Sequence, residues 1–229
     1  MSEMQGKVAL VTGGGSGIGR SCVEAFARNG AAVIVSDVDE GGGAESVRLV
    51  ESAGGRATFV RADVSQPADC EAMIGKAIEH FGRLDYACNN AGIGGEQNMI
   101  ADTSVDGWQK VIAINLSGVF YCMKYEIPAM LRNGGGAIVN MASILGAVGF
   151  ANSAAYVAAK HGVLGLTQNA TLEYSAQNVR VNTVGPGFIR TPLIAELEND
   201  RQAYEMLVSL HPIGRLGQPE EVAELVVWL

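Results

Sequence analysis

The chain of 229 residues has few cysteines and few histidines, and neither type is arranged to bind a metal. The cysteines stand at unrelated spacings without a C-x-x-C pair, which argues against a zinc site and against a disulfide framework. We expect reduced, mostly buried thiols at Cys22, Cys70, Cys88 and Cys122. The three histidines form no His-Glu-x-x-His pattern, so no metal site is predicted.

Basic runs and long apolar runs are also lacking. The formal net charge is -8, which argues against a nucleic acid or an anionic membrane surface as partner, because both require a basic face. No stretch approaches the roughly 20 apolar residues of a membrane span. The first residues lack the charged start and apolar stretch of a signal peptide. These absences predict a cytoplasmic protein.

Apolar runs of strand length alternate with helical patterns along the whole chain. With 48% hydrophobic residues, the chain can bury one sizeable core, in the range of a single α/β domain. The apolar runs are Val8–Val11, Ala32–Val35, Ala57–Val60, Leu84–Cys88, Ala137–Met141 and Val179–Val184. The helical patterns lie at 18–29, 44–53, 68–80, 106–132 and 156–176. This alternation predicts a doubly wound parallel sheet with helices on both faces, with glycine clusters such as Gly41–Gly43 as turns and helix stops.

The first strand runs into a glycine-rich turn, Thr12-Gly-Gly-Gly-Ser-Gly-Ile-Gly19, and then into a helix. A diphosphate needs free backbone N–H groups at a helix N-terminus and no side chains in the way, which Gly13, Gly17 and Gly19 would supply. The turn therefore predicts a dinucleotide site.

Asp37 follows the second apolar run, eighteen residues past Gly19. An acid at this place can accept from both ribose hydroxyls of an adenosine and repels a 2′-phosphate. No Arg or Lys follows Asp37 directly, and Ser16 puts no cation in the glycine loop, so NAD is predicted over NADP. The alternative is a loop acid that caps the next helix.

Tyr156 and Lys160 are four residues apart in a helical pattern and so share one helix face. A fixed cation stabilises the phenolate and lowers the pKa of the phenol from its usual value near ~10, which would make Tyr156 a proton shuttle. The alternative is a surface tyrosine beside a solvated lysine. Polar residues at the strand exits, where ligands bind in such sheets, favour the functional interpretation; they are Thr12, Asp37, Asp63, Asn89, Asn90, Ser143 and Thr191.

Taken together, these residues resemble the short-chain dehydrogenase/reductase family over nearly the whole chain. The matching motifs are Thr12–Gly19, Asp63-Val64, Asn89-Asn-Ala-Gly92, Asn115, Ser143, Tyr156-Val-Ala-Ala-Lys160 and Pro186–Thr191. The resemblance implies a Rossmann-type fold and a nicotinamide-dependent oxidoreductase. In it, Tyr156 is the general acid-base, Lys160 lowers the pKa of Tyr156 and binds the nicotinamide ribose, and Ser143 holds the substrate oxygen. Asn115 would distort its helix and position a water for proton relay, the alternative being a solvated amide on the helix face.

The resemblance also implies where the cofactor binds. Asp63 and Val64 would recognise adenine, the segment from Asn89 to Gly92 would pass under the adenine ribose, and Ile189 with Thr191 would meet the carboxamide. The predicted cofactor residues are Gly13, Ser16, Gly17, Ile18, Gly19, Asp37, Val38, Asp63, Val64, Asn89, Ala91, Gly92, Tyr156, Lys160, Pro186, Gly187, Ile189 and Thr191.

The substrate is less well determined by the sequence. Ser143, Leu145 and Tyr156 are the predicted substrate contacts, and residues 192–214 the predicted lid. Apolar lid residues, including Leu193, Ile194, Leu197, Tyr204, Met206 and Leu207, combine with Gly94, Gly95, Leu145 and Phe150 to predict a largely apolar pocket. A secondary alcohol, cyclic alcohol or diol would suit this pocket. Arg190 is a candidate residue for binding an anionic group of the substrate, and the alternative is an ordinary surface charge.

Three alternatives stay open at this point. An NADP-preferring carbonyl reductase is one. A nucleotide-sugar epimerase or dehydratase is the second, but such enzymes usually show a Gly-x-x-Gly-x-x-Gly turn and a larger sugar domain, whereas this chain has the spacing Gly-x-x-x-Gly-x-Gly. A non-catalytic dinucleotide-binding regulator is expected to have lost Ser143, Tyr156 or Lys160, all of which are present.

Two further expectations concern the C-terminus and assembly. Family members usually continue past the helix that begins at Pro219 with a further strand, so we expect that strand to be missing from this sequence. The patterns at 106–132 and 156–176 are apolar over more of their circumference than one sheet face can cover, which predicts a homo-oligomer. The resemblance implies a tetramer.

Overall fold

A parallel sheet of six strands forms the centre of the structure, a computed structural model that describes residues 4–195 and 200–229. The strands lie in the order β3-β2-β1-β4-β5-β6, and all neighbouring strands are parallel. Their bounds are β1 Val8–Thr12, β2 Ala32–Asp37, β3 Arg56–Arg61, β4 Tyr86–Asn89, β5 Gly136–Met141 and β6 Val179–Val184. The winding direction reverses between β1 and β4, so the predicted doubly wound sheet is confirmed.

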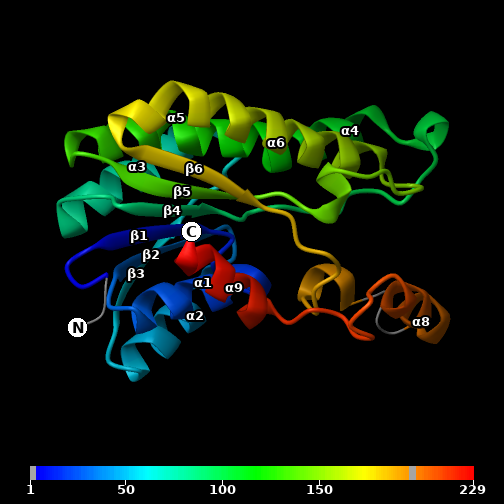
Figure 1. The fold of residues 1–229 in the computed structure, drawn as a ribbon, viewed down its shortest axis with the longest axis horizontal. Coiled ribbons are helices and arrows are strands. Elements are labelled where there is room, and N and C mark those ends of the chain that lie inside the picture. Colours follow the sequence, from blue (N-terminus) through cyan, green and yellow to red (C-terminus); the bar gives the residue numbers. More distant parts are fainter. Residues whose placement is uncertain (1–3, 196–199) are drawn as a thin grey trace.

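Helices cover both faces of this sheet (Figure 1). One face carries α3 (Pro67–Phe81), α5 (Gly118–Arg132) and α6 (Ala154–Tyr174), with α4 (Val105–Ile112) packed on α6. The other carries α1 (Gly17–Arg28), α2 (Glu40–Ser52) and α9 (Pro219–Trp228), while α8 (Arg201–Ser209) lies away from the sheet. Among the described helices, none is long and apolar enough to cross a membrane.

The four central strands, β2, β1, β4 and β5, are buried on both faces, which explains why their sequences are apolar without alternation, while the edge strands β3 and β6 are partly exposed. Leu10 and Ile34, partners in the β1–β2 register, pack with the α3, α5 and α6 side. Their neighbours Val11 and Val35, also paired, pack with the α1 and α9 side. Two hydrophobic cores therefore hold the layers together.

The glycines Gly41–Gly43 do not form the predicted turn. They are the first turns of α2, which Asp39 caps by accepting a hydrogen bond from the Gly41 N–H at 3.0 Å. A Cβ at Gly43 would lie 2.0 Å from the Phe59 ring, and one at Gly42 would lie 2.9 Å from the Gly15 carbonyl oxygen. Glycine is needed there because α2 packs closely on β3 and on the glycine-rich turn, a tertiary requirement that local propensity does not reveal.

The predicted helix at 106–132 is confirmed with an interruption. A π-helical turn, Ala113–Ser117, separates α4 from α5 and contains Asn115, whose side chain is buried. π-helical turns are uncommon and occur often at functional sites. The predicted distortion at Asn115 is therefore observed, and the alternative of a solvated amide is wrong.

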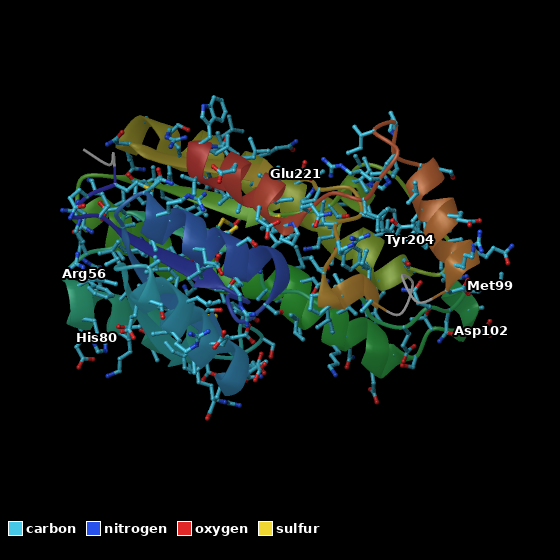
Figure 2. All side chains as sticks on the ribbon, turned by 90° about the horizontal axis from the view of Figure 1, so that it is seen from below. Arg56, His80, Met99, Asp102, Tyr204 and Glu221 are labelled. Carbon is cyan, nitrogen blue, oxygen red and sulfur yellow. The ribbon has the colours of Figure 1, made fainter. Side chains whose placement is uncertain are left out.

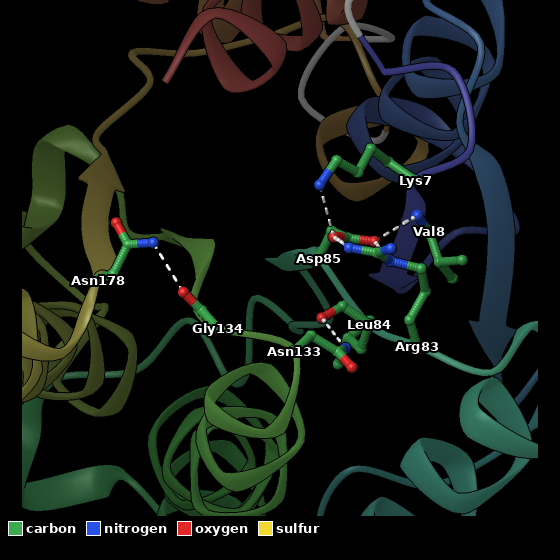
Figure 3. Close-up of polar contacts among 8 residues, drawn as sticks. All are labelled: Lys7, Val8, Arg83, Leu84, Asp85, Asn133, Gly134 and Asn178. Atoms are coloured by element: carbon green, nitrogen blue, oxygen red, sulfur yellow. Dashed lines mark hydrogen bonds and ion pairs between the residues drawn. The ribbon is translucent and has the colours of Figure 1, made fainter.

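A cluster of ion pairs lies at the edge of the sheet where β1 and β4 begin (Figure 3). The buried Asp85 carboxylate accepts hydrogen bonds from the Arg83 guanidinium at 2.6 and 2.7 Å, from Lys7 at 3.2 Å and from the Val8 N–H at 3.0 Å. Burial raises the pKa of Asp85, but the hydrogen bonds from Arg83, Val8 and Lys7 outweigh it and leave that pKa below its usual value. The cluster fixes the starts of β1 and β4 far from the candidate site.

A second polar network is buried between the sheet and α5. Asn89 donates to the Glu126 carboxylate and to the Asn140 side chain, both at 3.0 Å, and Asn140 donates to the Thr167 hydroxyl at 3.0 Å. One oxygen of Glu126 and the oxygen of Asn89 accept no hydrogen bond from the described residues. Burial raises the pKa of Glu126 to about 7, although the bond from Asn89 acts in the opposite direction. The network thus holds a carboxyl that is protonated at mildly acidic pH.

The first prediction concerns this carboxyl. Between its usual pKa of 4.5 and the folded value of about 7, the folded state keeps a proton that the unfolded state has lost, so stability falls as the pH rises through this range. Glu126→Gln is neutral and keeps an oxygen for Asn89. It should raise the free energy of unfolding by on the order of 1–3 kcal/mol at pH 8 and change it little at pH 4.5.

Urea unfolding across this pH range measures the effect, with Glu71→Gln on the exposed face of α3 as the control. An identical pH profile of stability in Glu126→Gln and the unmodified protein would contradict the assignment.

Candidate active site

The glycine-rich turn lies at the carboxyl end of β1, where the backbone approaches other segments very closely. Gly13 has φ +62, and a Cβ there would lie 2.9 Å from the Ala91 Cα; a Cβ at Gly19 would lie 1.9 Å from the Gly13 oxygen. The exposed Ser16 is the N-cap of α1, but its side chain makes no capping hydrogen bond. The N–H groups of the first turn of α1 therefore stay available for an anion.

Asp37 is held beside this turn. Its carboxylate accepts from the Gly15 N–H at 2.9 Å and from the Asp39 N–H at 3.0 Å. Arg20, which the sequence analysis did not select, donates to the carbonyls of Gly15 and Gly42 and to the Ser46 hydroxyl. Its only sequence signal is its place directly after the last glycine of the turn. Asp37 and the glycine turn thus form one wall of a cleft, as predicted, while Asp39 and not Asp37 caps α2.

Two predicted cofactor residues, Asn89 and Val64, turn their side chains into the core, which leaves only their backbone atoms for a cofactor. Asn89 is bonded to Glu126, and Val64 packs against Gly118, where a Cβ would lie 2.9 Å from the valine methyl group. Asn90, the next residue, lines the cleft and donates to the carbonyl oxygens of Thr12 and Gly13 at 3.1 and 3.2 Å. Asn90, which is not among the predicted cofactor residues, is therefore the asparagine of this segment whose side chain lines the cleft.

The remaining predicted cofactor residues divide by position. Those that line the clefts are Gly13, Ser16, Gly17, Ile18, Asp37, Gly92, Tyr156, Lys160, Pro186, Gly187, Ile189 and Thr191. Thr191 lies against the glycine turn, since a Cβ at Gly17 would come within 3.2 Å of its methyl group. Val38 is 54% exposed beyond Asp37, and the Asp63 carboxylate accepts from the Ser65 N–H within its own turn.

Tyr156 and Ser143 meet at the inner end of the cleft. Tyr156 lies in the first turn of α6, and Ser143 lies just past Met141, the last residue of β5. The Ser143 oxygen accepts from the Leu145 N–H at 3.1 Å and lies close enough to the Tyr156 hydroxyl to act on its pKa. Burial raises the pKa of Tyr156, and the neighbouring Ser143 hydroxyl acts against this rise.

Lys160 lies one turn further along α6 and is buried. Its ammonium donates to the Met141 carbonyl oxygen at 2.7 Å and lies 5.5 Å from the centre of the Tyr156 ring. Burial lowers the pKa of Lys160 to about 8. The predicted proximity of the pair is confirmed, but the predicted lowering of the Tyr156 pKa is not found, because burial of the phenol raises that pKa and only Ser143 acts against the rise.

Asn115 joins this group from the other side. Its amide donates to the Ile93 carbonyl at 2.8 Å and accepts from the Ile93 N–H at 2.9 Å. A Cβ at Gly92 would lie 3.4 Å from the Asn115 oxygen and 3.7 Å from the Lys160 nitrogen. The side chains of Asn115 and Lys160 therefore both lie next to the Gly92 backbone. The structure thus brings the predicted residues Asn115, Ser143, Tyr156 and Lys160 together in one place.

Apolar side chains form the outer walls of the cleft. Phe150 and Phe188 have ring centres 5.7 Å apart, and Leu145, Leu193 and Ile194 complete the lining. Phe188 was not predicted. Its N–H donates to the His211 ring at 3.0 Å, while the other ring nitrogen of His211 bonds the Leu207 carbonyl at 2.8 Å.

The predicted lid is only partly correct. Leu193 and Ile194 line the cleft, whereas Tyr204 and Met206 do not, and Leu207 is buried. Figure 2 shows Tyr204 at the same end of the molecule as Met99, opposite Arg56. Residues 196–199, with Leu197, lie outside the described residues. Gly95 packs on Val111 instead of lining the cleft, and Arg190 donates to the Tyr204 hydroxyl at 3.3 Å.

Comparison with known proteins agrees with this geometry. A family model described as enoyl-(acyl carrier protein) reductase matches residues 13–229. A cyclohexanol dehydrogenase of Acinetobacter sp. is 50% identical over 100% of this chain and 89% of that protein. A 2,5-dichloro-2,5-cyclohexadiene-1,4-diol dehydrogenase of Sphingobium indicum is 43% identical over 100% of this chain and 91% of that protein. The crystal structure of levodione reductase has a TM-score of 0.96 at 38% identity, over 99% of this chain and 91% of the other.

The parallel sheet, the glycine turn at its carboxyl edge and these matches lead to one conclusion: the chain belongs to the short-chain dehydrogenase/reductase family and is an oxidoreductase that acts on CH–OH groups or ketones.

Proposed function

We propose that the protein transfers a hydride between NAD(H) and a secondary alcohol or ketone, most readily a cyclic one, with Tyr156 as general acid-base. The observation that carries this proposal is the gathering of Ser143, Tyr156 and Lys160 in an apolar cleft that continues to the glycine turn. Relatives named for cyclohexanol and for a cyclohexadiene diol support a ring as the substrate skeleton.

The residues around the glycine turn fit a dinucleotide. Uncapped N–H groups of α1 would hold its diphosphate, and Asp37 would accept from the adenosine ribose. The nicotinamide of NAD supplies the hydride acceptor for oxidation and the hydride donor for reduction.

This chain's own residues manage the proton. Ser143 holds the substrate oxygen, and the Tyr156 oxygen takes the hydroxyl proton during oxidation or returns it to the carbonyl oxygen during reduction. Because burial raises the pKa of Tyr156, the phenol keeps its proton at neutral pH, which suits donation to a ketone. Lys160, fixed by Met141 and close to the ring, would stabilise the phenolate formed in that step.

The NAD preference follows from charge at the ribose position. A 2′-phosphate would face the Asp37 carboxylate, and Arg20 is already engaged with two carbonyls and Ser46. We therefore favour NAD over the alternative of an NADP-preferring carbonyl reductase. A non-catalytic regulator is disfavoured because Ser143, Tyr156 and Lys160 are all present, and no observation favours an epimerase.

Tyr156→Phe tests the acid-base assignment. The ring and its packing remain while the hydroxyl is lost, so kcat for cyclohexanol oxidation should fall by about 10²–10⁴-fold. Binding of NADH, followed by its fluorescence, should change little, which serves as the control for folding. A kcat near that of the unmodified enzyme would mean that another group transfers the proton.

Asp37→Ala tests the cofactor assignment. Removal of the charge that repels a 2′-phosphate should narrow the preference for NAD, measured as the ratio of kcat/KM with NAD⁺ and with NADP⁺. Replacement of the neighbouring Asp39 with Ala, which removes a cap and leaves the ribose position unchanged, is the matched control. Equal efficiency of both cofactors in the unmodified enzyme would refute the assignment.

We also propose that the protein is a homotetramer. The sheet buries Val119, Met123 and Val163 but leaves Phe120 48% and Leu172 86% exposed on α5 and α6. A groove between these helices is mostly apolar; it is lined by Leu116, Ser117, Phe120, Tyr121, Gly162, Gly165, Leu166 and Asn169. A second copy of the same surface would cover it around a two-fold axis.

Light scattering tests the assembly. The expected mass is four times that of the 23.9 kDa chain, and Phe120→Glu should lower it by placing a charge in the contact. Leu210→Glu, on an exposed leucine after α8, is expected to leave the mass unchanged. A monomer at micromolar concentration would show that these helix faces are simply solvated.

A further inference from the structure

Two polar side chains in the cleft have no role in the proposed function. Of the polar residues that line it, Ser143, Tyr156 and Lys160 form the proton-transfer group, while Asn90 and Thr191 also line the cleft of the glycine turn. Gln97 and Ser153 remain, and both belong to the wall of the substrate cleft alone.

Gln97 and Ser153 are bonded to each other. The Ser153 hydroxyl is 3.3 Å from the Gln97 side-chain oxygen and donates to it. Ser153 is only 6% exposed, and a backbone bridge between Asn98 and Ser153 holds the two segments together. The amide oxygen of Gln97 is therefore oriented by a nearly buried partner.

This arrangement leaves the amide nitrogen of Gln97 with unused donors. An amide nitrogen carries two N–H groups, and within the described residues no acceptor is bonded to this one, which the exposed position of Gln97 leaves open to solvent or a ligand. The surrounding walls are apolar, with Phe150 and Phe188 prominent among them. A donor pair at the wall of an apolar cleft is the kind of group that fixes the orientation of a ligand.

The position of the pair relative to Tyr156 selects the kind of ligand. Ser153 precedes Tyr156 by three residues, and its carbonyl already accepts from the Val157 N–H at 2.9 Å, so it belongs to the same helical turn. Ser153 is the N-cap of α6 and Tyr156 lies in its first turn, and both line the cleft together with Gln97. A ring that is held at Tyr156 by one oxygen can therefore present a second oxygen to Gln97.

Resting on the proposed function, we propose that Gln97, oriented by Ser153, binds a second oxygen of the substrate. The reacting oxygen lies between Ser143 and Tyr156, the ring lies between the apolar walls, and the opposite oxygen accepts from the Gln97 amide. The substrate class is therefore cyclic alcohols and ketones that carry a second hydroxyl or carbonyl, in preference to rings with one oxygen.

The test compares kcat/KM for NAD⁺-dependent oxidation of cis- and trans-1,4-cyclohexanediol with that of cyclohexanol. The unmodified enzyme should favour at least one diol isomer about tenfold, the size expected from one hydrogen bond to a neutral group. Gln97→Met keeps the length of the side chain and removes its donors, so the diol-to-cyclohexanol ratio should fall close to one. Ser153→Ala should reduce the ratio less, because it removes only the orienting bond.

Gln177→Met is the matched control. Gln177 is an exposed glutamine just before the amino end of β6, at the edge of the sheet opposite the cleft, and its replacement should leave the ratio unchanged. Equal efficiency for diols and cyclohexanol in the unmodified enzyme, or a ratio preserved in Gln97→Met, would overturn the inference while the proposed function stands. Failure to oxidise any of these alcohols with NAD⁺ or NADP⁺ would instead overturn the proposed function, and this inference with it.

Discussion

The hydroxyl of Thr12 accepts hydrogen bonds from the backbone N–H groups of Asn90 and Ala91, at 3.0 and 3.1 Å. It therefore ties the exit of β1 to the exit of β4 at the point where the sheet changes its winding direction. The glycine turn follows Thr12 on one side, and Gly92 follows Ala91 on the other, against Asn115 and Lys160. The positions of the cleft beside the glycine turn and of the group formed by Asn115, Tyr156 and Lys160 both depend on this contact.

The elements of the fold could be predicted because their signals are local. A parallel strand buried on both faces reads as an apolar run, and all six runs overlap the observed strands. The glycines of the turn and the spacing of Tyr156 and Lys160 are likewise fixed within a few residues. In contrast, the cluster Gly41–Gly43 predicts a turn when it is considered alone. Glycine is required there because Phe59 and Gly15, from elsewhere in the chain, approach α2 too closely for a side chain.

The site could be predicted as a set of segments more reliably than as a set of side chains. Successive residues at a strand end point to opposite faces, so Asn89 enters the core while Asn90 reaches the cleft, and their sequence context is the same. The lid is only partly correct for a similar reason: Leu193 and Leu207 are both leucines in the sequence, and only packing decides that Leu193 lines the cleft while Leu207 is buried. Phe188 depends on His211, twenty-three residues away, which no local pattern reveals.

The two clefts are built partly from the same residues. Ile18, Asn90, Thr191 and Leu193 line both the space beside the glycine turn and the space beside Tyr156. A molecule bound in one space contacts side chains that also wall the other, and wherever binding moves these side chains the two binding free energies are coupled. Such coupling is reciprocal, so whatever factor the dinucleotide adds to the affinity for the second ligand, that ligand adds to the affinity for the dinucleotide.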